Sequence, residues 1–116
     1  MIARRKYGTR VLSVFLVAAA CCSGARAEDV FSTSITIRAH RFEPSELHVP
    51  ADKRILLTVI NADPLSEEFD SAALKVEKVV AGNSQAIVRI APLNPGTYEF
   101  VGEYHEETAK GRVIAE

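Results

Sequence analysis

The sequence predicts an all-β domain, a Greek-key β-sandwich or barrel of about seven short strands. Three features of the chain lead to this prediction. Apolar and polar residues alternate in short runs that suit half-buried strands. Pro and Gly recur at turns spaced about ten residues apart. No long amphipathic helix, internal repeat or low-complexity tract is visible between these runs.

The first 27 residues have the layout of a secretory signal peptide. Four basic residues among the first ten precede the apolar run 11–20 (VLSVFLVAAA), and Ala25-Arg26-Ala27 is a small-x-small cleavage site. The apolar run is too short to span a bilayer. We therefore expect cleavage after Ala27, which leaves residues 28–116 as one secreted domain with no membrane span. The alternative is an N-terminal core helix.

Removal of this leader changes the charge of the protein. The leader holds five of the 14 Lys+Arg and none of the 15 Asp+Glu, so the formal net charge of residues 28–116 is −6, against −1 for the whole chain. Nucleic acid and anionic lipid are poor partners for an acidic surface, whereas metal cations or basic surfaces suit it.

Both cysteines of the chain, Cys21 and Cys22, lie in the leader. The domain that follows therefore offers no disulfide and no thiolate for copper. A lipid anchor on Cys21 is an alternative to plain secretion, but Ala18 stands where a lipoprotein cleavage box usually has Leu or Val.

Each expected strand is justified by its own alternation and by the turn that ends it. Ile35 and Ile37 share one face of the first strand, and Pro44 breaks the chain after it. Leu47 and Val49 alternate with polar neighbours in the second, which places His48 on the solvent face. The expected strands are 34–38, 46–49, 55–60, 76–80, 86–90, 97–101 and 111–115. The segment 64–75 is less regular, and we expect at most one helical turn there.

Three segments, taken in order, resemble the cupredoxin family. They are 40–51 (HRFEPSELHVPA), 57–61 (LTVIN) followed by 67–69 (EEF), and 92–100 (PLNPGTYEF). The resemblance covers nearly all of residues 28–116 and implies a cupredoxin-like Greek-key fold.

The ligand positions depart from the family pattern. Blue-copper members carry Cys-x2-His-x4-Met on the loop between the last two strands, and the corresponding positions here are Gly102, His105 and Lys110. Glu67 falls where the first ligand histidine of the family stands. The resemblance therefore implies that His105 is retained. Without a thiolate, no type 1 blue-copper site and no rapid copper electron transfer are expected.

A narrower resemblance points to iron. The blocks 67–71 (EEFDS), 74–80 (LKVEKVV) and 102–105 (GEYH) are similar to the iron-transport-associated (EfeO-type) periplasmic cupredoxins. This resemblance implies a helper in iron acquisition that binds copper, iron or both and supports Fe²⁺ oxidation or handover. The implied partner is an iron permease complex or another periplasmic metal-binding protein.

Five residues are candidate metal ligands. Imidazole suits Cu, Zn or Fe, so His105 on its acidic loop is the first candidate. Glu67 and Glu68 are neighbours and would point to opposite faces of a strand, and the family position favours Glu67. Glu103 shares a face with His105 if the strand extends that far. In the cupredoxin layout His40 lies at the same end. The alternative for each is an ordinary solvated surface residue.

Three functions stay open on the sequence alone. The first is metal binding in iron uptake, and the second is copper binding or delivery. The third is a metal-free protein-interaction module on a cupredoxin scaffold. An independent enzyme is not expected, because no complete catalytic constellation is visible, although an accessory ferroxidase-like role fits the iron interpretation.

Overall fold

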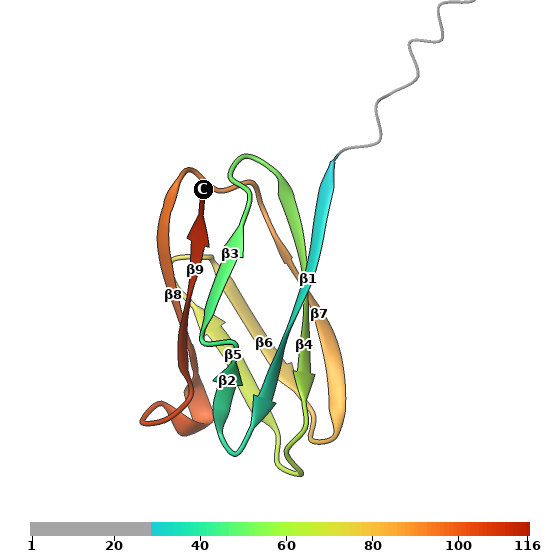
Figure 1. The fold of residues 1–116 in the computed structure, drawn as a ribbon. Helices are drawn as coiled ribbons and strands as arrows, with labels where there is room; N and C mark the ends of the chain where they lie inside the picture. Colours follow the sequence, from blue (N-terminus) through green and yellow to red (C-terminus); the bar gives the residue numbers. More distant parts are fainter. Residues whose placement is uncertain (1–28) are drawn as a thin grey trace, which may run out of the picture.

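Nine strands in two sheets make up the part of the chain that the structure, a computed structural model, describes, residues 29–116 (Figure 1). The strands are β1 (Val30–Arg38), β2 (Arg41–Glu43), β3 (Glu46–Val49), β4 (Arg54–Asn61), β5 (Glu67–Ser71), β6 (Val76–Val80), β7 (Ser84–Ile90), β8 (Gly96–Gly102) and β9 (Lys110–Ala115). A single 3-10 turn, η1 (Glu103–His105), joins β8 to β9. The expected all-β sandwich is confirmed.

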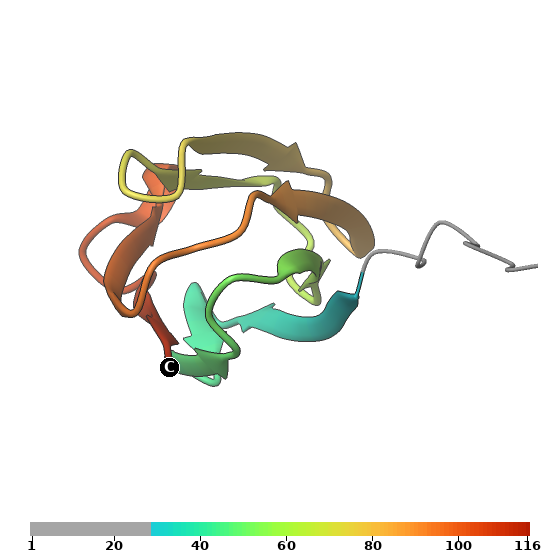
Figure 2. The ribbon, with the colours of Figure 1, turned by 90° about the horizontal axis from the view of Figure 1, so that it is seen from above.

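The two sheets are mixed. One has the strand order β2-β1-β4-β7 and the other β3-β9-β8-β5-β6. β1 runs parallel to β4 and β3 parallel to β9, while the other paired strands are antiparallel. Seen from above, the strands surround a common interior (Figure 2).

The interior is filled by alternate residues of the strands, as the period of two requires. The parallel pairing of β1 with β4 sets Ile35 opposite Val59, and both are almost fully buried. Three phenylalanines meet near one end of this core. The ring centroid of Phe100 lies 4.9 Å from those of Phe42 and Phe69. Edge-to-face and tilted aromatic pairs of this kind add about 0.5–1.5 kcal/mol each beyond the area they bury.

The expectation for segment 64–75 was wrong. Residues Glu67–Ser71 form strand β5, in which Glu67, Phe69 and Ser71 point inward. Two of these three inward residues are polar, so the apolar alternation that marks a half-buried strand is missing from the sequence. The three-residue strand β2 was also not expected, and the count is therefore nine strands rather than about seven.

Two further expectations concern the signal peptide and the membrane. The predicted signal peptide, residues 1–27, lies outside the described residues. Among residues 29–116, no helix is long and apolar enough to cross a membrane.

Candidate metal centre

Glu67 is a carboxylate buried at one end of the sandwich. It is the first residue of β5, and the inward parity of that strand leaves it only 1% exposed. Its Oε1 accepts hydrogen bonds from the backbone N–H of Tyr104 at 2.9 Å and of Glu68 at 3.2 Å. Its Oε2 lies 2.5 Å from Nδ1 of His105. A buried carboxylate is costly unless hydrogen bonds or a positive charge compensate it, and these contacts supply that compensation.

His105 is brought to Glu67 by the turn that follows β8. It is the last residue of η1, and its carbonyl accepts hydrogen bonds from Thr108 N at 3.1 Å and Ala109 N at 2.8 Å. These bonds close the loop before β9 and fix the backbone at His105. The side chain is 25% exposed, so the ring faces both the buried carboxylate and the surface.

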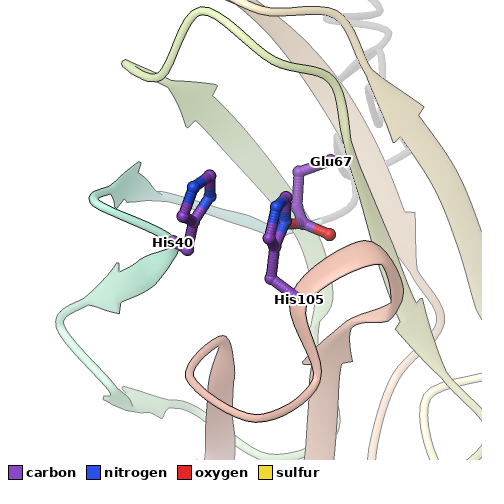
Figure 3. A group of neighbouring side chains, drawn as sticks. All are labelled: His40, Glu67 and His105. Atoms are coloured by element: carbon purple, nitrogen blue, oxygen red, sulfur yellow. The ribbon is translucent and has the colours of Figure 1, made fainter.

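His40 lies against His105 although 65 residues separate them in sequence. The ring centroids are 3.7 Å apart and the planes differ by 14°, so the rings are stacked (Figure 3). His40 comes from the turn between β1 and β2, and its side chain is 39% exposed. Because the rings are nearly parallel, a tilt of the exposed His40 ring is required before both imidazoles can face one ion.

An unusual turn holds His40 in place. Ala39 and His40 both have left-handed backbones, with φ of 51° and 55°. This is the backbone that a two-residue β-hairpin turn needs, but glycine and asparagine adopt it far more readily. Asp63 compensates the strain, because its Oδ1 accepts from Ala39 N at 2.8 Å and its Oδ2 from His40 N at 2.9 Å.

Asp63 also adds negative charge beside the histidines. Its Oδ2 lies 3.5 Å from Nδ1 of His40. The hydrogen bond from the His40 backbone, with that from Ala39 and the nearby charges of His40 and His105, holds the pKa of Asp63 below its ordinary value, although burial opposes this. The carboxylate is therefore charged across the neutral pH range, and its field favours a cation at the two imidazoles.

The structure separates the five predicted ligands into two groups. It brings His40, Glu67 and His105 together, with one donor atom from each within 4.8 Å of the others. Glu68 and Glu103 lie elsewhere and form a second acidic group with Glu77. Glu68 is on the outer face of β5, as its adjacency to Glu67 requires. Glu103 does not share a face with His105, because β8 ends at Gly102 and the 3-10 turn begins there.

The second acidic group consists of carboxylates only. Glu68 is partly buried between Glu77 and Glu103, and desolvation together with these two neighbouring carboxylates raises its pKa. No histidine belongs to this group. Its chemistry is therefore that of crowded surface acids, in contrast to the mixed group around Glu67.

Sequence reasoning missed Asp63. In the sequence, Asn61-Ala62-Asp63-Pro64 has the composition of a turn that ends a strand, and nothing in it points to a role at the histidines. Asn61 shapes this loop, because its Oδ1 accepts from Asp63 N at 3.0 Å and its Nδ2 donates to the carbonyls of Leu65 and Val80. The available signal was a short acidic side chain at a turn, a residue type that often accepts backbone N–H bonds.

The three grouped side chains fit a transition-metal ion. Two imidazoles and one carboxylate form a donor set that proteins use for non-haem Fe²⁺, and imidazole also suits Cu²⁺ and Zn²⁺. Glu67 and His105 have hydrogen-bonded partners that fix their orientation, and Asp63 does the same for the His40 turn. Such supporting contacts are typical of metal ligands.

A family model described as a cupredoxin-like domain matches residues 11–115. The chain belongs to this cupredoxin-like family. An uncharacterized protein of Rickettsia prowazekii (strain Madrid E) is 39% identical over 87 residues, which cover 75% of this chain and 70% of that protein. The expected cupredoxin-like domain is thereby confirmed.

Solved structures show the same cupredoxin fold. Auracyanin A, a blue copper protein from Chloroflexus aurantiacus, matches with a TM-score of 0.65 at 14% identity over 76% of this chain and 100% of that one. The metal binding domain of the Streptococcus pneumoniae D39 Cu(I)-exporting P-type ATPase CopA, with Cu(I), matches with a TM-score of 0.61 at 14% identity, over 77% and 97% of the chains. At these identities the likeness concerns the fold alone.

Within this cupredoxin-like domain, the donors near His105 are nitrogen and oxygen. No cysteine follows Cys22 in the sequence. Lys110, where blue-copper members of the family carry methionine, is exposed at the start of β9. The arrangement can therefore offer imidazole and carboxylate donors but no thiolate.

Proposed function

We propose that this cupredoxin-like domain binds a transition-metal ion through His40, Glu67 and His105. One observation carries the proposal: a carboxylate that is 1% exposed lies against one of two stacked imidazoles at an end of the sandwich. The histidines come from a turn and a 3-10 element that are far apart in sequence. Ordinary surface histidines do not require a buried charged partner of this kind.

Iron is the first candidate, because two imidazoles and one carboxylate are a ligand set of non-haem Fe²⁺ sites. Two histidines and one carboxylate suit Fe²⁺, and further coordination positions can be left for water or another ligand. An anionic oxygen donor stabilises Fe³⁺ more than Fe²⁺, because the attraction grows with the charge of the ion. The domain would then ease Fe²⁺ oxidation in addition to holding the ion.

The proposal extends to a role in iron uptake outside the cytoplasm. It is supported by the leader-like segment 1–27, by the net charge of −6 on residues 28–116, and by the resemblance of the blocks around Glu67 and His105 to iron-transport-associated cupredoxins. Handover to an iron permease complex or to another periplasmic metal-binding protein follows from the same resemblance.

Copper is the second candidate. The solved structures of similar fold include a blue copper protein and a Cu(I)-binding domain of a copper exporter. Cu²⁺ also binds nitrogen and oxygen donors more tightly than Fe²⁺ does. A copper-binding or copper-delivery role would use the same histidines and would depend less on Glu67.

Titration calorimetry with Cu²⁺ and with Fe²⁺ under anaerobic conditions tests the proposal. Cys21 and Cys22 are replaced by serine in every sample, so that no thiol competes for the ion. We expect micromolar or tighter binding, weakened at least about tenfold, or about 1.4 kcal/mol, by His105→Ala, His40→Ala and Glu67→Gln. Glu103→Gln is the matched control, since Glu103 lies in the other acidic group.

The pattern across these variants separates the candidates. Strong dependence on Glu67 with Fe²⁺ supports the iron role, whereas Cu²⁺ binding that depends on His40 and His105 but little on Glu67 supports the copper role. The absence of binding, or binding that none of the three variants changes, would leave the domain as a scaffold for a protein partner.

A further inference from the structure

Gly102, the last residue of β8, has no room for a side chain. It is buried and lies opposite Phe69 of β5. A Cβ atom at residue 102 would be 2.6 Å from Cβ of Ala109, 2.7 Å from Cδ of Glu67 and 2.9 Å from Oε1 of Glu67. All three distances are shorter than real Cβ contacts. The space that a side chain of residue 102 would fill is thus taken in large part by the Glu67 carboxylate.

The backbone does not require glycine at this position. Gly102 has φ of −89° and ψ of 105°, which is extended backbone that any residue adopts. Its N–H donates to the carbonyl of Ala109 at 2.8 Å, a bond that any residue except proline can make. The reason for glycine at residue 102 is therefore the space above its Cα.

The carboxylate that uses this space cannot move aside at low cost. Glu67 would lose the hydrogen bonds from Tyr104 N and Glu68 N and its contact with His105. A buried carboxylate that loses its partners is strongly destabilising. Residues 67 and 102 are therefore coupled: a long side chain at one requires the absence of a side chain at the other.

We propose that Gly102 determines which donor atom faces the two histidines. The bare Cα admits an oxygen donor, Glu67, from the neighbouring strand β5. Any side chain on residue 102 would occupy the same volume from β8 and exclude that carboxylate. Gly102 is thus a specificity-determining residue for ions that accept nitrogen and oxygen donors, as opposed to ions held by thiolate. This inference rests on the proposed metal site.

The first part of the test asks whether residues 67 and 102 share one volume, with no metal present. All samples are the full chain with Cys21→Ser and Cys22→Ser. Imidazole nitrogen NMR reports the hydrogen bond between His105 Nδ1 and Glu67. We expect Gly102→Ala to remove this bond. Ala109→Gly, the matched control, is expected to keep it, and Gly102→Ala with Ala109→Gly is expected still to lack it, because the contact with Glu67 remains.

The second part asks whether residue 102 supplies the donor. The variant Gly102→Cys with Glu67→Ala and Ala109→Gly exchanges the carboxylate for a thiol in the same space, and the change at Ala109 removes the other contact of a Cβ on residue 102. We expect bound Co²⁺, a probe that does not oxidise thiols, to show thiolate charge-transfer absorption in this variant and none in the parent chain. The added change His105→Ala is expected to weaken that Co²⁺ binding at least about tenfold.

These results also separate this inference from the proposed function. If the parent chain binds no ion, the proposed function fails, whereas the Co²⁺ spectrum of the cysteine variant still decides the role of residue 102. Retention of the His105–Glu67 hydrogen bond in Gly102→Ala would overturn the inference. A cysteine variant that binds Co²⁺ without the thiolate band would overturn it as well. The cysteine variant also keeps the test decisive if Gly102→Ala does not fold.

Discussion

Asp63 is the residue on which the position of His40 depends most directly. Two backbone N–H groups of the left-handed Ala39–His40 turn donate to its carboxylate, at 2.8 and 2.9 Å. Left-handed backbone costs a residue other than glycine roughly 1–2 kcal/mol, and this pair of charged hydrogen bonds offsets that cost. The histidine is therefore held in place by a residue that contacts it mainly through its backbone.

Asp63→Ala is expected to lower the free energy of unfolding by about 1.5–3 kcal/mol, the usual range for hydrogen bonds to a charged group. Urea denaturation measures this change. It is also expected to weaken metal binding, because His40 is no longer held against His105. The control is Asp70→Ala on the partly exposed face of β5, which should change stability by less than about 0.5 kcal/mol. An Asp63 variant as stable as its parent would contradict this role.

At the residue scale, sequence reasoning placed part of the candidate site. His105, Glu67 and His40 were named from family positions, and the structure brings their donor atoms together. Glu68 and Glu103 were named from their proximity in sequence, which does not decide the direction of a side chain. For Glu103, the deciding fact is that β8 ends one residue earlier, and this depends on the loop geometry around Ala109 rather than on local pattern.

The parallel strands β3 and β9 carry a cluster of ionisable side chains, and the contribution of this cluster to stability depends on pH. His48 is expected on the solvent face, and it lies there between Glu116, 2.7 Å from its Nδ1, and Glu46, 2.9 Å from its Nε2. Glu46 also accepts two bonds from the Arg112 guanidinium, at 2.9 and 2.6 Å. Hydrogen bonds to Glu116 and then Glu46 raise the pKa of His48 above 6.5.

A raised histidine pKa stabilises the folded state when the ring is protonated. The contribution is complete below the unfolded value of 6.5 and is lost as the pH rises through the higher folded value. We therefore expect His48→Gln to lower the melting temperature at pH 5.5 and to have little effect at pH 9. Thermal unfolding followed by circular dichroism at both pH values measures this. A difference that is constant with pH would contradict the assignment.

At the element scale, the sequence predicted seven of the nine strands. The two that it missed have specific causes. β2 has three residues, too few for an alternation to be recognised. β5 turns the polar residues Glu67 and Ser71 inward, where Ser71 Oγ donates to the carbonyl of Glu99 at 2.6 Å. A strand that serves a polar site thus lacks the apolar pattern by which strands are predicted.

In the whole molecule, the candidate site lies next to the aromatic cluster of Phe42, Phe69 and Phe100. The β1–β2 turn, the loop before β5 and η1 meet at the end of the sandwich opposite the C-terminus (Figure 1). Phe69 is two residues from Glu67 on the same face of β5, and it packs against Phe42 and Phe100. The Glu67 carboxylate and the aromatic cluster therefore share the inner face of β5.

Phe69→Ala is expected to cost about 3–5 kcal/mol of stability, the range for deleting a fully buried phenylalanine side chain. Urea denaturation gives this value. Val79→Ala, whose side chain is 53% exposed on the adjacent strand β6, is the control and should cost less than about 0.5 kcal/mol. A Phe69 variant within 1 kcal/mol of its parent, on the order of a surface change, would contradict the described core.

X-ray absorption spectroscopy of the Fe²⁺-loaded protein tests the central claim most directly, because it reports the imidazoles bound to the ion. We expect two imidazole ligands in the parent chain with Cys21→Ser and Cys22→Ser, and one in His40→Ala and in His105→Ala. An Fe²⁺ environment with no imidazole, or one that neither histidine variant changes, would contradict a metal centre at His40, Glu67 and His105.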